Sequence, residues 1–90
     1  MGKVIITVLG KDTVGIIARV CTYLAASGIN ILDINQTIVQ DYFHMMMIAD
    51  MSRAEKSLET VMSDLDGLGE EIGVRIRVQR EEIFTGMHRI

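Results

Sequence analysis

Few side chains in this 90-residue sequence are of types that carry catalysis, and those present are scattered. The two histidines, His44 and His88, have no second His or Cys close to them in the sequence. The single cysteine, Cys21, lies on an apolar helical stripe, so we expect a buried and unreactive thiol in a reducing compartment. No nucleophile elbow, Ser/His/Asp set or P-loop spacing occurs. The sequence therefore predicts a protein that is not an enzyme and holds no metal or cofactor.

Three residues, Asp12, Gly15 and Asn30, are better candidates for binding chemistry. Gly15 stands in the first turn of a predicted helix, where a glycine lets a ligand or a partner chain approach the backbone. Asp12 has two interpretations, a helix cap or a contact for a ligand's ammonium group. Asn30, at the start of the next predicted strand, either satisfies backbone groups or contacts a ligand. Both alternatives stay open for each of these residues.

Two other clusters have simpler explanations. Residues 45–47 are three methionines, whose thioethers suit Cu(I), but packing in a core or an interface is their commoner role. We interpret them as interface residues. Arg75, Arg77 and Arg80 form a cationic row that suits an anion, but charges on an edge strand usually prevent unwanted pairing. We therefore expect these arginines to be solvated.

Hydrophobic periodicity predicts the elements that position these residues. Alternating and β-branched residues predict strands over 3–9, 29–40, 43–51 and 74–78, with a hairpin turn at residues 41–42. Spacings of three and four predict a helix from Val14, capped by Asp12 or Thr13 and ended by Gly28. A second helix is predicted after a capping box at residues 52–55, and it ends at Gly73.

The resulting order, βαββαβ, predicts the α+β ferredoxin-like sandwich, a four-stranded antiparallel sheet with two helices on one face. The third strand is apolar on both faces, so we expect a second subunit to pack there or beside it, with Met46 and Ile48 in the dimer interface. Residues 1–82 form the predicted domain. Residues 83–90 form a short helical tail that docks on the domain or on a neighbouring subunit.

Composition limits the partners. Hydrophobic residues make up 49% and charged residues 23% of the chain, which predicts one folded domain. The net charge of −3 and the two Phe and two Tyr exclude a surface built for nucleic acid. No apolar run approaches 18 residues and no signal-peptide pattern occurs, so we expect no membrane association and a cytoplasmic location.

Residues 10–18, which read Gly-Lys-Asp-Thr-Val-Gly-Ile-Ile-Ala, followed by residues 28–31, resemble the ACT domain family. The spacing of Gly15 from Asn30 carries the likeness, and the whole chain, tail included, resembles the small single-ACT-domain proteins of prokaryotes. The resemblance implies a regulatory module that dimerises, or forms a higher homo-oligomer, and binds an amino acid or a similar metabolite.

In ligand-binding ACT domains, the first loop of one subunit and the second strand of its neighbour hold an effector amino acid. The resemblance thus implies ligand-binding roles for Gly10, Lys11, Asp12, Thr13, Val14, Gly15, Ile16, Asn30 and Ile31. The exposed N–H groups of a helix start suit a carboxylate. The alternative is a dimerisation or protein-docking module that has no ligand.

Overall fold

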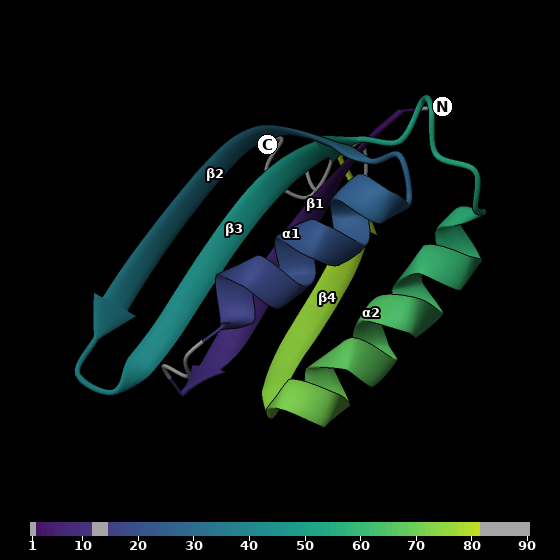
Figure 1. Cartoon of the computed structure of the whole chain (residues 1–90). Helices are drawn as coiled ribbons and strands as arrows, with labels where there is room; N and C mark the ends of the chain where they lie inside the picture. The colour runs from purple at the N-terminus through teal and green to yellow at the C-terminus, as the bar shows by residue number, and fades with distance from the viewer. Residues whose placement is uncertain (1, 12–14, 82–90) are drawn as a thin grey trace.

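The computed structural model describes residues 2–11 and 15–81, which form four strands and two helices. In chain order these elements are β1 (Lys3–Lys11), α1 (Ile16–Ala26), β2 (Asn30–Val39), β3 (Tyr42–Asp50), α2 (Leu58–Ile72) and β4 (Val74–Arg80). Both helices lie on the same face of the sheet (Figure 1). The predicted ferredoxin-like class is confirmed. The predicted tail, residues 83–90, lies outside the described residues.

The sheet is antiparallel throughout, with the strand order β2-β3-β1-β4. The prediction of a central strand over residues 43–51 is confirmed, because β3 pairs with β1 on one side and with β2 on the other. Alternation along β3 divides its methionines between the two faces. Met45 and Met47 are fully buried in the core, so their interpretation as interface residues is wrong, whereas Met46 and Ile48 are half-buried on the opposite face.

The hydrophobic core lies between the two central strands and the helices. From the sheet it takes alternate residues of β1, β3 and β4, and from the helices it takes one stripe each. These residues include Val4, Ile6, Val8, Phe43, Met45 and Met47 from the strands, and Val20, Leu24, Val61 and Leu65 from the helices. Burial of these apolar groups is the main favourable term in the folding of the domain.

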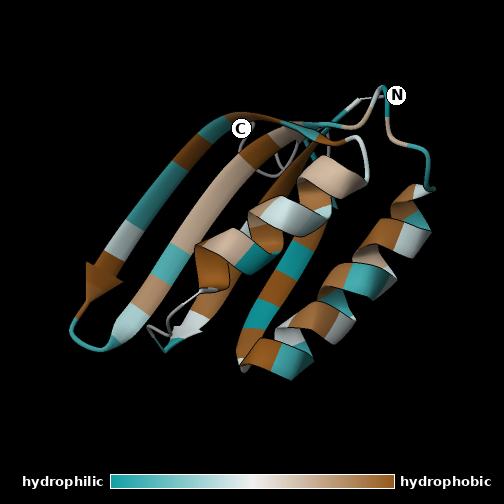
Figure 2. Ribbon diagram, viewed as in Figure 1, coloured by the Kyte–Doolittle hydropathy of each residue, from teal (hydrophilic) through white to brown (hydrophobic). Residues whose placement is uncertain are grey.

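The edge strand β2 lies outside this core. Nine of its ten residues are exposed, and Ile31 is half-buried. Figure 2 shows hydrophobic and hydrophilic residues alternating along β2, with neither helix over it. The alternation that predicts this strand is therefore present, but the described residues leave its apolar side chains exposed. The hairpin to β3 turns at residues 40–41, one residue earlier than predicted.

The start of α1 differs from the prediction. The helix begins at Ile16, not Val14, and its N-cap is Gly15, so the capping roles predicted for Asp12 and Thr13 are wrong. Gly15 has φ 89°, a left-handed conformation that favours glycine, and it provides no side-chain cap. Residues 12–14 lie outside the described residues. The sequence predicts that Gly15 lets a ligand or a partner chain approach the backbone. In the structure Gly15 also gives the backbone the conformation that leads into α1.

The start of α2 also differs from the prediction. The capping box predicted at residues 52–55 is wrong, because the helix begins at Leu58 with Ser57 as N-cap. The Ser57 hydroxyl accepts a hydrogen bond from the Thr60 amide at 3.2 Å. Ser52 instead donates its amide and its hydroxyl to the Asp50 carboxylate, at 2.9 and 3.1 Å. The residues between β3 and α2 therefore form a connecting segment with a turn of its own.

Two glycines near the end of α2 have different roles. A Cβ at Gly69 would lie 2.6 Å from the Val74 carbonyl oxygen, whereas a Cβ at Gly67 would meet nothing within 4 Å. We expect Gly67→Ala to raise the free energy of unfolding by about 0.5 to 1 kcal/mol, because alanine is the better helix former. Gly69→Ala should lower it by about 1 to 3 kcal/mol, because the added methyl pushes α2 away from β4. Urea unfolding of both variants tests this, and equal effects would contradict the close approach of α2 to β4.

Candidate functional site

The first half of the predicted site lies where β1 meets α1. Gly10 and Lys11 end β1, and Gly15 leads into Ile16, the first residue of α1, which is buried. Gly15 is exposed, and a Cβ there would meet nothing within 4 Å, so the space beside it is open. A Cβ at Gly10 would lie 2.8 Å from a side-chain carbon of Val74, so Gly10 is required for packing against β4. Asp12, Thr13 and Val14 lie outside the described residues.

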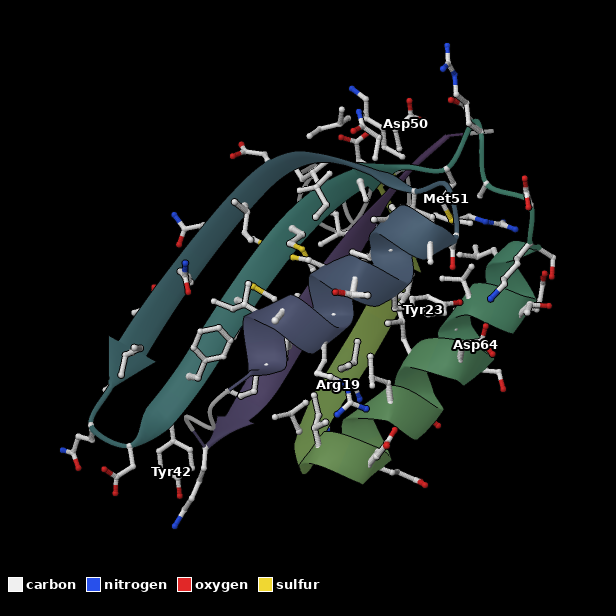
Figure 3. The ribbon with its side chains drawn as sticks, in the orientation of Figure 1. Arg19, Tyr23, Tyr42, Asp50, Met51 and Asp64 are labelled. Carbon is white, nitrogen blue, oxygen red and sulfur yellow. The ribbon has the colours of Figure 1, made fainter. Side chains whose placement is uncertain are left out.

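The second half lies at the other end of the sheet. Asn30 and Ile31 start β2, where Asn30 is opposite Asp50, and Asp50 is in turn opposite Lys3 at the start of β1. β1 is nine residues long, which at roughly 3.3 Å per residue separates its ends by about 26 Å. In Figure 3, Asp50 lies at one end of β3 and Tyr42 at the other. A single chain therefore does not bring Asn30 near Gly15.

Asn30 lines a cavity of about 450 Å³ together with Gly28, Asp50, Ser52 and Arg53. This cavity, which we call the Asn30 cavity, carries one acidic and one basic side chain. The two hydrogen bonds that Ser52 donates hold the pKa of the Asp50 carboxyl below its ordinary value, so this group is ionised at neutral pH. A carboxylate, a guanidinium and an amide together match the ammonium and carboxylate groups of an amino acid.

Asp50, Ser52 and Arg53 were missed as site residues by the sequence analysis. The signal for Asp50 was present, because the end of one hairpin strand pairs with the start of the other, which places Asp50 opposite Asn30. Arg53 carried no such signal. A Cβ at Gly28 would lie 2.9 Å from the Arg53 carbonyl oxygen. Arg53 is therefore placed beside β2 by the contact between the α1–β2 and β3–α2 connections.

The predicted interface residues, Met46 and Ile48, lie on the sheet face opposite the helices. Directly across from them on β1 are Thr7 and Ile5, and on β2 Asn35 and Asp33. This face, which neither described helix covers and which we call the open face, therefore has an apolar centre, where Ile5 is buried, and a polar β2 edge. On β4, Arg75 and Arg77 are exposed, as predicted for cations on an edge strand.

The other chemistry-bearing residues are dispersed. Within residues 2–11 and 15–81, no three His, Cys, Asp or Glu side chains cluster in a way that suits a metal ion. Cys21 is half-buried, not fully buried as predicted, and burial raises the pKa of its thiol, which favours the less reactive protonated form. No helix among the described residues is both long and apolar enough to span a bilayer.

A polar network joins the two helices at one side of the site region. The Tyr23 hydroxyl donates to the Asp64 carboxylate at 2.6 Å, and Lys56 Nζ lies 3.1 Å from the same oxygen (Figure 3). The Lys56 ammonium also lies 4.8 Å from the centre of the Tyr23 ring. These two hydrogen bonds, that from Tyr23 first, hold the pKa of the Asp64 carboxyl below its ordinary value. The network thus fixes Lys56 beside the start of α2.

We expect Tyr23→Phe to raise the pKa of the Asp64 carboxyl, because it removes the hydrogen bond that lowers this pKa most. The network's contribution to stability is present above the unfolded pKa of Asp64 and is lost as pH falls through its lowered folded pKa. Carbon-detected NMR titration of the Asp64 carboxyl group measures the shift. Lys56→Gln should raise the pKa less, and an unchanged pKa in Tyr23→Phe would contradict the network.

The element order and the strand order define a ferredoxin-like α+β module, and the comparisons with known proteins narrow the class. The sequence model of the ACT domain family matches residues 3–79. A UPF0237 protein of Bifidobacterium longum is 62% identical over 90 residues, which cover 100% of both chains. An ACT domain protein from Streptococcus pneumoniae has a TM-score of 0.81 at 38% identity, with 91% of this chain and 92% of that chain covered.

The regulatory subunit of aspartate kinase from Thermus thermophilus shares the fold, with a TM-score of 0.67 at 22% identity, covering 88% of this chain and 51% of that one. The present chain belongs to the ACT domain family. Members of this family are usually small-molecule regulatory domains.

Proposed function

We propose that this protein is a non-catalytic regulatory module that self-associates and binds a small metabolite, first of all an amino acid, between two subunits. The ligand contacts the loop from Gly10 to Ile16 of one subunit and Asn30 with Ile31 of another. No cofactor takes part. Residues 1–82 form the binding domain, and residues 83–90 dock on it or on a neighbouring subunit in the cytoplasm.

One observation carries the proposal, namely that the two halves of the site lie at opposite ends of the same sheet. A second subunit turned end for end relative to the first brings the start of its β2 to the end of the sheet that holds Gly15. Neither half is complete alone. Gly15 leaves the helix start without a side-chain cap, and the Asn30 cavity opens beside an exposed strand.

The exposed edge of β2 supports such an arrangement. Ile34 is 41% exposed and Ile38 is 58% exposed, on the sheet face that also carries the helices, and Ile17 of α1 is exposed as well. A long edge strand with unpaired backbone groups and apolar side chains is suited to pairing with another strand. Two β2 strands that pair in antiparallel fashion cover these residues and place Asn30 of one subunit beside Val39 of the other.

The open face supplies a second contact between subunits. Met46 and Ile48 are half-buried at the centre of this face, opposite the helices. Packing of two open faces removes this apolar centre from water. Pairing of two β2 strands, which we call the edge contact, forms the binding site, and packing of two open faces, the face contact, adds association energy. Because the two contacts use different surfaces of one subunit, an oligomer larger than a dimer is compatible with both.

Charges near each half fit the ligand. An α-carboxylate is attracted to the N-terminal N–H groups of α1 or to Arg53, and an α-ammonium group to Asp50. Asn30 donates or accepts a further hydrogen bond. A protein-docking module without a ligand is the second candidate, favoured by the large exposed apolar side chains of β2, which are Leu32, Ile34, Ile38 and Val39.

The face contact is tested by substitution. We expect Met46→Asp and Ile48→Asp to weaken association by about tenfold or more, because an unpaired carboxylate in an apolar contact costs several kcal/mol. Met62→Asp, on the solvent-exposed part of α2, is the matched control and should not change association. Sedimentation velocity at micromolar concentration measures the oligomeric state. A folded monomer in the wild type, or unchanged association in both variants, would argue against the contact.

The ligand site is tested first by a thermal-shift screen of the twenty amino acids against the wild type, because a ligand of the folded state raises the melting temperature. Calorimetric titration of the best ligand then compares variants. Asn30→Ala should weaken binding by about 0.5 to 1.5 kcal/mol, the usual contribution of one hydrogen bond. Gly15→Asn should abolish binding, because its side chain fills the open space while asparagine tolerates positive φ.

Gly73→Asn is the matched control for Gly15→Asn. Gly73 has φ 80° and no neighbour within 4 Å of an added Cβ, but it ends α2 and is not among the residues proposed to contact the ligand. It should bind the ligand as the wild type does. Full binding by folded Gly15→Asn and Asn30→Ala would place the site elsewhere, and no stabilisation by any amino acid would favour the docking module.

A further inference from the structure

A second cavity lies at the end of the sheet opposite the Gly15 loop. Its volume is about 450 Å³, and it is bounded by the start of β1, the segment between β3 and α2, the first residues of α2 and the end of β4. Its apolar lining includes Val4, Met51 and Leu58, of which Val4 and Met51 are buried. We call it the α2 cavity. It shares only Ser52 with the Asn30 cavity.

The described charged residues around the α2 cavity all have the same sign. Within residues 2–11 and 15–81, Lys3, Lys56 and Arg80 line it and no carboxylate does, in a chain whose net charge is −3. Lys56 pairs with Asp64, and Lys3 lies opposite Asp50 across the strands. Arg80 forms no ion pair with any of the described residues. Three cations from three distant parts of the sequence therefore converge, and one of them, Arg80, pairs with no carboxylate of the described residues.

The first turn of α2 adds to this positive potential. Ser57 satisfies the amides of Thr60, through its hydroxyl, and of Val61, through its carbonyl. The amides of Leu58 and Glu59 have no acceptor among the described residues. Both belong to the positive end of a 15-residue helix, and Leu58 itself lines the cavity.

We propose that the α2 cavity binds a small anion that carries an apolar body, such as an aromatic or branched carboxylate or phosphate. The anionic group lies at the rim, where it contacts Arg80 and Lys3, and the apolar body packs on Val4, Met51 and Leu58. The cavity is formed within one chain. This second site therefore needs no partner subunit and does not depend on the amino-acid site proposed above.

The test uses the full chain and the fluorescent probe 8-anilinonaphthalene-1-sulfonate, an aromatic anion. Its uncharged counterpart is N-phenyl-1-naphthylamine, which has the same aromatic body and no sulfonate. We expect Arg80→Gln and Lys3→Gln each to weaken binding of the anionic probe by about fivefold or more, as for the loss of a charge-assisted hydrogen bond. Arg75→Gln, which removes an exposed cation of β4 outside the cavity, should leave binding unchanged.

A second measurement locates the probe. In amide NMR spectra, the signals of Leu58 and Glu59 should shift on addition of 8-anilinonaphthalene-1-sulfonate, and that of Gly15 should not. Three results would overturn the proposal. These are equal affinity for the charged and uncharged probes, the same loss of binding in Arg75→Gln as in Arg80→Gln, and shifts confined to residues outside the α2 cavity.

Discussion

The structure depends on one packing constraint, the burial of one face of the β1–β3 pair beneath two helices. Met45 and Met47 from β3 and Ile6 and Val8 from β1 meet helical residues there and are fully buried. The chain has no third helix among its described residues, so β2 receives no cover. The apolar residues of β2 and of the open face are therefore left without a helix because both helices cover the β1–β3 pair. Burying these residues against another molecule removes apolar surface from water.

The same constraint decides where the binding residues lie. Antiparallel pairing with the order β2-β3-β1-β4 puts the last residues of β1 and β2 at the same end of the sheet, on either side of β3, and puts Asn30 at the far end. Only a rearranged sheet would bring Asn30 to Gly15 within one chain, and the buried core forbids it. A site that uses both residues must be shared between subunits, so the occupancy of such a site is linked to the oligomeric state of the protein.

The fold was predictable from the sequence because the period of the apolar residues distinguishes strands from helices and indicates which side of each element faces the core. The central position of β3 was visible in its apolar run, and the end of α2 was visible in Gly73. The helix starts were not predictable, because several residues near each start can cap, and the choice between Ser52 and Ser57 depends on the turn that Asp50 forms. The cavities were least predictable. Lys3, Lys56 and Arg80 are close only because the sheet and α2 bring their segments together.

The two cavities are joined by one segment of the chain. Residues 51–57 connect β3 to α2, with Ser52 and Arg53 beside the Asn30 cavity and Met51, Ala54 and Lys56 beside the α2 cavity. This segment is tied at its start by the Asp50–Ser52 hydrogen bonds and by the Ala54 amide, which donates to the Met51 carbonyl at 3.0 Å. If both proposed sites bind ligands, a ligand that shifts this turn from one side would alter the lining of the other cavity, and by linkage the effect would be mutual. The connection between β3 and α2 is the one described segment that lines both cavities, with Ser52 common to the two.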